Sequence, residues 1–134
     1  MDVKAISYLL RNNANLVAAV PAAKIFSGVI PLNTVLPAIV IRHIDDVELK
    51  MVKTAGVPKL ITARVQVTVQ ALSYSSQKAV LELIRLALVS TRSTVNGVAV
   101  DSISSEGSGP DLWDQDASIY EQSRDFFIRW SVSA

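Results

Sequence analysis

The segment from Ala63 to Ala71 alternates strictly between apolar and polar side chains, and this pattern constrains the fold more than any other part of the chain. Successive side chains of a strand point to opposite faces of its sheet, so the alternation predicts a long strand with one buried face. The predicted buried residues are Ala63, Val65, Val67, Val69 and Ala71, and the residues on the other face are Arg64, Gln66, Thr68 and Gln70.

A second alternating segment precedes this one, after a strand start at Ile39–Ile41 that follows Leu36-Pro37. Its apolar residues are Val47, Leu49 and Met51, and its polar residues are Asp46, Glu48 and Lys50. Residues 54–58, Thr-Ala-Gly-Val-Pro, separate the two segments and have the composition of a turn. We expect the two strands to pair as an antiparallel hairpin that extends beyond the body of the domain.

Two other segments have the period of about 3.6 residues that is typical of amphipathic helices. The first follows Asp2, a favourable N-cap residue, and is predicted over residues 3–13 or, with an extra turn, through Val17. The second is predicted to begin at a cap formed by Ser75 or Ser76. Its apolar stripe consists of Val80, Leu83, Ile84, Ala87 and Leu88.

The remaining segments are predicted to be strands and their connections. A short strand is expected at residues 25–29, and a tight turn at Asn96-Gly97 leads into a strand that contains Val98, Val100 and Ile103. Residues 104–116 are rich in Ser, Gly and Asp and are predicted to form a loop, and residues 120–132 a long last strand. This order lacks regular βαβ alternation. It favours one α+β domain, residues 1–134, with a mostly antiparallel sheet, two flanking α-helices and a long β-hairpin.

Composition limits the classes of function. Half of the residues are hydrophobic and the mean hydropathy is +0.35, yet no run approaches the roughly 20 apolar residues that a membrane-spanning helix requires. We therefore expect no membrane association, and we assign the surplus apolar surface to contacts between subunits. Thirteen basic and twelve acidic residues nearly cancel, which disfavours a non-specific nucleic-acid binder. The absence of cysteine excludes disulfides and thiolate metal sites and is compatible with a reducing compartment.

The chain has one histidine, His43, and no cluster of residues that resembles a catalytic site. Asp45 could orient the imidazole as in an acid–base pair, but the sequence places no serine nucleophile beside it. A hydrogen-bonded strand residue is the simpler interpretation. We predict that the protein is not an enzyme and that it has no catalytic residue.

The predicted loop at 104–116 offers two weaker candidates for ligand binding. Its carboxylates are Glu106, Asp111, Asp114 and Asp116, and they lack the spacing and closing glutamate of a calcium-binding loop. The run from Gly107 to Pro110 lacks the lysine and the helix start of a phosphate-binding loop. We predict no metal and no cofactor.

The residues with the strongest indications of a role are apolar side chains where a solvated surface is expected. An indole in a polar loop, here Trp113, either folds back on the core or anchors a partner. Leu86 and Val89 fall on the polar side of the second helix. The acidic group at 45–48, next to two lysines, is either a solvated hairpin face or, in a ring, a device that sets the register between neighbours. The predicted interface residues are Asp46, Val47, Glu48, Leu49, Lys50, Met51, Leu86, Val89, Leu112 and Trp113.

A family resemblance adds to this interpretation. The segment Ala63–Tyr74, which runs into the helical segment Ser76–Leu88, resembles the centre of the tail-completion (tail-terminator, head–tail joining) proteins of long-tailed bacteriophages. Similar patterns occur in ISYLLR at 6–11, KIFSG at 24–28, LPAIV at 36–40 and FFIRW at 126–130. The likeness covers nearly the whole chain, and it consists of hydrophobic and turn patterns. Members often carry an acidic residue where this chain has Thr68, so an inter-subunit salt bridge at that position is not carried over.

The resemblance implies a sheet flanked by two helices, no enzymatic activity and a homohexameric ring. Such a ring caps the tail tube and joins it to the neck, so the implied partners are other copies, the tail tube protein and a neck or head-completion protein. DNA would pass through the ring without sequence-specific binding. The implied location is the tail–head junction of the virion, after assembly in the host cytoplasm. The alternative is a homo-oligomeric adaptor module that has no enzymatic activity and no relation to phages.

Overall fold

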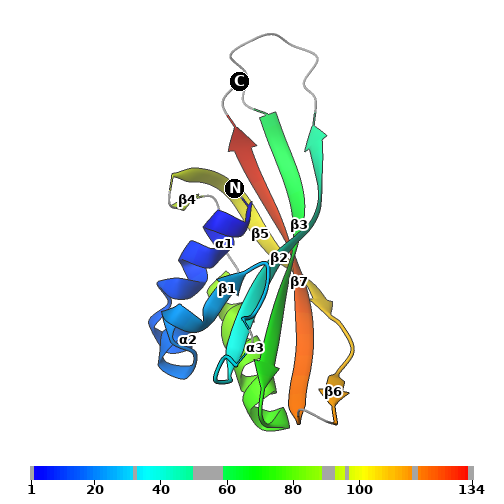
Figure 1. Ribbon diagram of the computed structural model, residues 1–134. Helices are drawn as coiled ribbons and strands as arrows, with labels where there is room; N and C mark the ends of the chain where they lie inside the picture. Colours follow the sequence, from blue (N-terminus) through cyan, green and yellow to red (C-terminus); the bar gives the residue numbers. More distant parts are fainter. Residues whose placement is uncertain are drawn as a thin grey trace.

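The computed structural model describes residues 2–31, 33–49, 59–88, 93–95, 97–115 and 118–132. Within them, helices lie on one side of a strongly curled sheet (Figure 1). The predicted turn at 54–58 lies outside the described residues. In chain order the elements are α1 (Asp2–Arg11), α2 (Ala14–Ala19), the 3₁₀ turn η1 (Ala22–Lys24), β1 (Ile25–Ser27), β2 (Ala38–Leu49), β3 (Lys59–Ala71), α3 (Tyr74–Leu88), β4 (Ser93–Val95), β5 (Val98–Ser108), β6 (Leu112–Asp114) and β7 (Ile119–Val132).

The sheet has the strand order β1-β2-β3-β7-β5-β4, and β6 pairs with β7 beside this path. All of these pairings are antiparallel except that of β1 with β2. The predicted hairpin is confirmed, because β2 pairs with β3 from Ala38↔Gln70 to Leu49↔Leu60. Figure 1 shows these two strands and β7 continuing beyond the helices. The fold is therefore α+β with a mostly antiparallel sheet.

The helices cover the concave side of the sheet and enclose one hydrophobic core. The alternating residues of β3 that were predicted to be buried all belong to this side, and none exceeds 1 % exposure. From β7, Phe126 and Ile128 point into the same core and are fully buried, while Trp130 packs against its margin. The period of two therefore identified the inner face of β3.

The N-terminal helical segment differs from the prediction because it divides into two helices. Asn13 takes an extended backbone conformation (φ −89°, ψ 112°), and its Oδ1 accepts a hydrogen bond from the Leu16 amide at 3.0 Å. An asparagine that caps a new helix competes with continuation of the old one. Three α-helices therefore stand in the described residues where two were predicted, and Asp2 is the first residue of α1 rather than a cap before it.

Helix α3 also differs in detail from its prediction. Its cap is Ser73, whose Oγ accepts a hydrogen bond from the Ser76 amide at 3.2 Å, and not Ser75 or Ser76. The buried stripe includes Gln77 and Leu81, whereas Leu83 and Ala87 of the predicted stripe are only partly buried. The remaining stripe residues, Val80, Ile84 and Leu88, are buried as predicted. The helix is thus rotated slightly about its axis relative to the predicted face.

The predicted loop at 104–116 is wrong for most of its length. Strand β5 continues through Ser108 by pairing with β7, and Leu112–Asp114 forms β6 on the same partner strand. The register between β5 and β7 shifts between Val100 and Ser102 and again between Ser105 and Gly107. Ladder hydrogen bonds to a long neighbouring strand hold this segment, so its low β-propensity is overridden by pairing.

Candidate interaction surfaces

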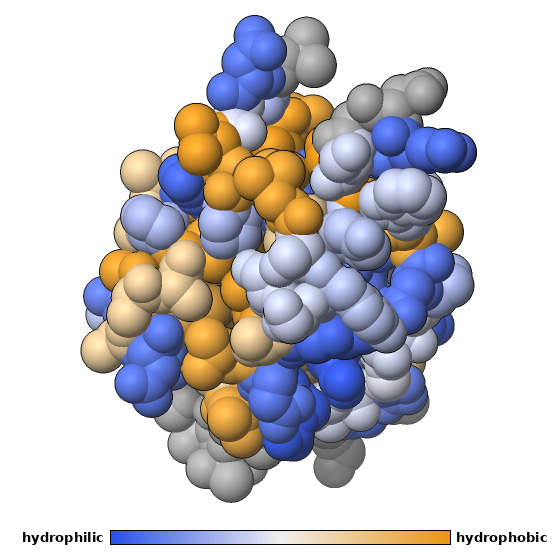
Figure 2. All heavy atoms as spheres, turned by 90° about the horizontal axis from the view of Figure 1, so that it is seen from below, coloured by the Kyte–Doolittle hydropathy of each residue, from blue (hydrophilic) through white to orange (hydrophobic). Residues whose placement is uncertain are grey.

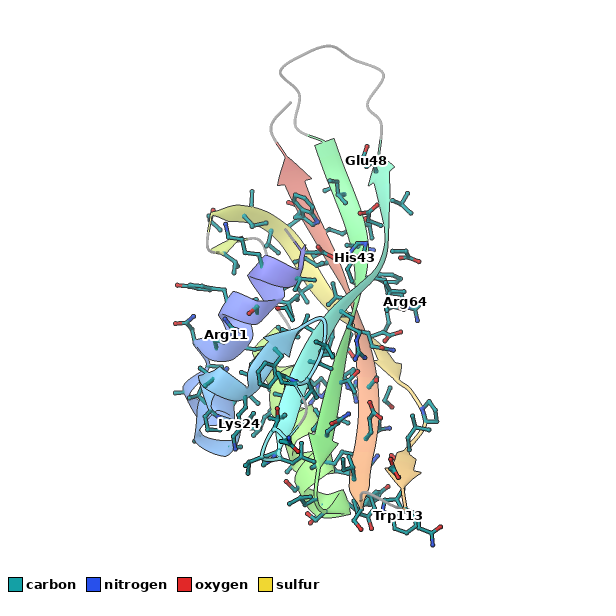
Figure 3. All side chains as sticks on the ribbon, viewed as in Figure 1. Arg11, Lys24, His43, Glu48, Arg64 and Trp113 are labelled. Atoms are coloured by element: carbon teal, nitrogen blue, oxygen red, sulfur yellow. The ribbon has the colours of Figure 1, made fainter. Side chains whose placement is uncertain are left out.

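Three aromatic rings gather at the end of the molecule where α3 begins and β6 lies. The Trp113 ring stacks on Tyr120 with ring centroids 6.0 Å apart, and Tyr74 stacks on the same Tyr120 at 6.2 Å. We call these three residues the aromatic cluster. Trp113 keeps 55 % of its surface exposed, and Leu112 beside it is also exposed. Trp113 is therefore held against a strand by one face and presents the other to solvent (Figure 3).

A polar network of Lys78, Asp111 and Gln122 contacts the aromatic cluster at Tyr74. Lys78 Nζ lies 2.5 Å from Asp111 Oδ1, donates to Gln122 Oε1, and sits 5.0 Å from the centroid of the Tyr74 ring. Tyr74 Oη donates to Asp111 Oδ2 at 2.9 Å. The hydrogen bond to Asp111 raises the pKa of Lys78, and the same bond lowers the pKa of Asp111. Tyr74 is thus held by two charged groups, and Tyr120 stacks on both Tyr74 and Trp113 before any partner binds.

The surface around this end is mixed. Seen from below (Figure 2), apolar side chains reach the surface in several patches separated by hydrophilic ones. Leu72, which lies between β3 and α3 and two residues before Tyr74, is also exposed. Large exposed apolar side chains that cluster, rather than occur singly, are typical of a protein-binding surface.

The second predicted surface lies where the β2–β3 hairpin projects beyond the helices, near the end of the ladder at Leu49↔Leu60 and at the opposite end of the molecule. We call residues 45–48 of this projecting part the hairpin base. Asp46, Val47 and Glu48 are exposed, and Val47 has 68 % of its surface accessible. Leu49 is the last residue of β2. Of the remaining predicted residues, Lys50 and Met51 lie outside the described part of the chain.

His43 ties this hairpin to the first helix. Its Nδ1 lies 2.5 Å from Asp2 Oδ2, and its Nε2 lies 3.7 Å from Asp46 Oδ2. The partner is therefore Asp2 and not Asp45, which the bulge between His43 and Asp45 places elsewhere in the ladder. The hydrogen bond to Asp2 raises the pKa of His43. Burial opposes ionisation of Asp2, but hydrogen bonds from His43 and the Val3 amide lower its pKa overall.

The third predicted surface is the outer side of α3. Leu86 is 61 % exposed, as its position on the polar side predicted. Its neighbours Glu82 and Arg85 form an exposed ion pair in which Arg85 Nε donates to Glu82 Oε2 at 3.0 Å. Val89 lies outside the described residues. The described part of this surface is thus one apolar side chain beside a solvated pair.

The positions considered for chemistry are all engaged in structure. Gly107 lies within β5, and the Gly109 amide donates to Ser123 O at 2.8 Å, so no helix follows the glycine-rich run. Thr68 is buried and its hydroxyl pairs with that of Ser123 at 2.8 Å. Among the described residues no group of His, Asp and Glu is arranged to hold a metal ion, and Asp116 lies outside them. In the same part of the chain no helix is long and apolar enough to cross a membrane.

The structure therefore separates the predicted residues into surfaces at two ends and one flank. It brings Trp113 together with Tyr74 and Tyr120, which the sequence analysis had not selected. Tyr74 stands at the first position of α3 and Tyr120 near the start of β7, so no local spacing links them to Trp113. The signal that could have suggested their meeting is the shared position of all three at element ends.

The fold resembles that of a protein from a phage-like particle. A chain from a structure described as the virion of a native gene transfer agent (GTA) particle aligns with a TM-score of 0.64 and 14 % identity, over 95 % of this chain and 92 % of that chain. The two chains therefore share one fold over nearly their whole lengths. Comparison with curated protein sequences gave no significant match.

The sequence identifies the family. The family described as tail completion protein gp17 matches residues 4–129, which is nearly the whole chain. The chain belongs to this family of structural phage tail proteins, and the resemblance found from the hydrophobic patterns is confirmed.

Proposed function

We propose that the protein forms a hexameric ring that ends the phage tail tube and joins the tail to the neck of the capsid. Membership in the tail completion family over residues 4–129 is the observation that carries this proposal. The fold shared with a chain of a gene transfer agent virion supports it. In this account the protein acts by shape and adhesion and not by catalysis, and DNA passes through the ring without sequence-specific contacts.

A protein that joins two structures needs two separate binding surfaces, and this molecule has exposed apolar residues at both ends. Val47 lies at the hairpin base, and the aromatic cluster lies at the far end of the sheet. Figure 1 places the hairpin and β6 at opposite extremes of the molecule. One end contacts the tail tube and the other contacts the neck or head-completion protein. Neighbouring copies meet through the flanks, including Leu86, and through the hairpin base.

Rigid anchors favour this arrangement. The three rings are already stacked, and Tyr74 among them is held by Lys78 and Asp111, so the cluster loses little conformational entropy on binding. Aromatic side chains at the centre of an interface often carry much of its binding energy. The aromatic cluster is therefore the surface on which a test has the greatest effect.

The test is complementation of a particle-producing strain from which the gene has been deleted. We expect the deletion to yield separate heads and tails, and the unaltered gene to restore joined particles. Trp113→Lys and Val47→Asp should fail to restore them although each purified variant stays folded. Joined particles in normal yield from Trp113→Lys would contradict the assignment of the aromatic cluster. Joined particles in normal yield from the deletion strain, or a pure protein that stays a small dimer when mixed with tail tubes, would favour the adaptor alternative.

A further inference from the structure

Charges of opposite sign are segregated along the first part of the chain. No acidic residue occurs between Asp2 and Asp45, and this stretch contains Lys4, Arg11 and Lys24 and also Arg42, whose Nε donates to Gly28 O at 2.8 Å. Asp45, Asp46 and Glu48 then follow closely. The net charge of the whole chain is only +1, so neither group reflects a general excess of its sign.

Two of the basic residues, Lys4 and Arg11, line a shallow hollow beside α1, and Lys24 ends the 3₁₀ turn η1. This hollow of about 240 Å³ is lined by Lys4, Tyr8 and Arg11 of α1, together with Ser7, Asn12 and Ser27. Arg11 Nη2 donates to Ile25 O at 2.6 Å, which holds the guanidinium against the margin of β1. Within the described residues, Lys4, Arg11 and Lys24 form no ion pair. We call these three side chains and the hollow the basic face.

The acidic residues lie along an open edge of the sheet. β1 pairs only with residues 39–41 of β2, so in the described part of the chain the outer edge of β2 beyond Ile41 has no strand beside it. Arg64 stands opposite Asp45 in the ladder, but its Nε and Nη2 both donate to Asp125 Oδ2, at 2.9 and 2.7 Å. His43 partly offsets Asp46 at 3.7 Å. Glu48, which follows Asp45 and Asp46 along β2, is exposed.

The two surfaces occupy different parts of the molecule. Figure 3 shows Arg11 and Lys24 on one side of the molecule and Glu48 on the other, above His43. Arg11 and Lys24 are therefore separated from Glu48 within one chain. Two different patches that attract each other and lie on opposite sides produce a head-to-tail contact, which closes into a ring when the rotation between copies allows it.

We propose that the acidic hairpin base of one copy docks on the basic face of the next copy. The inference rests on the proposed ring and specifies its contact. Tyr8 supplies an exposed aromatic surface between the cations, and Val47 supplies an exposed apolar one between the carboxylates. Opposite charges set the register of the contact and speed the encounter, and the apolar pair adds burial at its centre.

Charge-reversal variants test this pairing by sedimentation velocity of the purified chain at low salt. One variant carries Asp46→Lys and Glu48→Lys, and the other carries Lys4→Glu and Lys24→Glu. We expect the unaltered chain to associate, more weakly at high salt because the charges are screened, and each variant alone to associate at least tenfold more weakly. A mixture of the two variants should recover assembly, because each supplies the charge that the other lost. A chain carrying all four changes should self-associate.

A matched control, Glu106→Lys, makes the same change of charge on an exposed residue of β5 and should associate normally. An unaltered chain that stays monomeric at millimolar concentration, or a mixture that fails to recover assembly, would overturn the proposal. Normal assembly of the Lys4→Glu/Lys24→Glu variant with lost retention on duplex DNA would instead assign the basic face to nucleic acid and also overturn it. If the reversed variants join heads to tails normally while the deletion strain does not, the docking proposal fails and the proposed function stands.

Discussion

Replacement of Trp113 by alanine should weaken binding to a particle partner far more than it weakens the fold. The indole is 55 % exposed. Since a tryptophan presents up to about 250 Å² of surface, roughly 140 Å² is free for a partner. Burial of that area against a partner, at about 25 cal/mol per Å², contributes about 3 kcal/mol to the free energy of binding, which is more than a hundredfold in affinity.

The fold loses less when the same side chain is removed. Trp113 touches the sheet through one stacked partner, Tyr120, in a three-residue strand whose side chains are all exposed. A lost aromatic stack costs about 0.5–1.5 kcal/mol, so thermal unfolding of Trp113→Ala should shift by only a few degrees.

The assay is co-sedimentation of the purified chain with tail tubes and, separately, with neck proteins, over a range of concentrations. Trp113→Ala should raise the apparent Kd by about two orders of magnitude for one of the two partners. Trp113→Tyr is the matched control, because it keeps a stacking ring and should recover most of the affinity. Equal binding of Trp113→Ala and the unaltered chain to both partners would refute the assignment of this side chain as an anchor.

Further changes test other parts of the account. Phe126→Ala should lower the free energy of unfolding by about 3–5 kcal/mol, because Phe126 is fully buried, and a loss below about 1 kcal/mol in urea denaturation would contradict its place in the core. The contact between His43 and Asp2 should stabilise the fold from about pH 4 to about pH 6.5 and lose this effect as the pH rises through the raised pKa of His43 or falls through the lowered pKa of Asp2. For a partly exposed pair the effect is about 0.5 kcal/mol, and a pH dependence of unfolding unchanged in His43→Ala would disprove it. Leu86→Lys should leave the melting temperature unchanged within about two degrees but reduce self-association in light scattering, and unaltered association would remove Leu86 from the subunit contact.

Periodicity predicted the sheet because one face of each central strand is uniformly buried. The alternation at Ala63–Ala71 identified the inner face of β3 and the hairpin it forms with β2. Alternation does not reveal a β-bulge. The irregularity between His43 and Asp45 shifts the register there, and Asp45, the predicted partner of His43, is not the carboxylate that contacts it. The partner that replaced it, Asp2, is 41 residues away along the chain, beyond what any local pattern can indicate.

The errors in the other elements have two physical origins, tertiary pairing in one case and a local side-chain cap in the other. Residues 104–108 have the composition of a loop but extend β5, because β7 offers a full ladder of hydrogen bonds. Asn13 divided the first helix through a side-chain bond that competes with helix continuation. The sequence analysis selected Trp113 for its unusual setting, and the stack with Tyr74 and Tyr120 that supports it required three-dimensional packing.

Electron cryomicroscopy of particles from strains with and without the gene tests the central claim most directly. We expect a closed ring of several identical copies of this fold at the capsid-proximal end of the tail tube, with the hairpin and the aromatic cluster facing different partners. In particles without the gene this density should be missing and the tails should be detached from the heads. A single copy at the junction, copies distributed along the tube, or intact junctions without the gene would contradict the account.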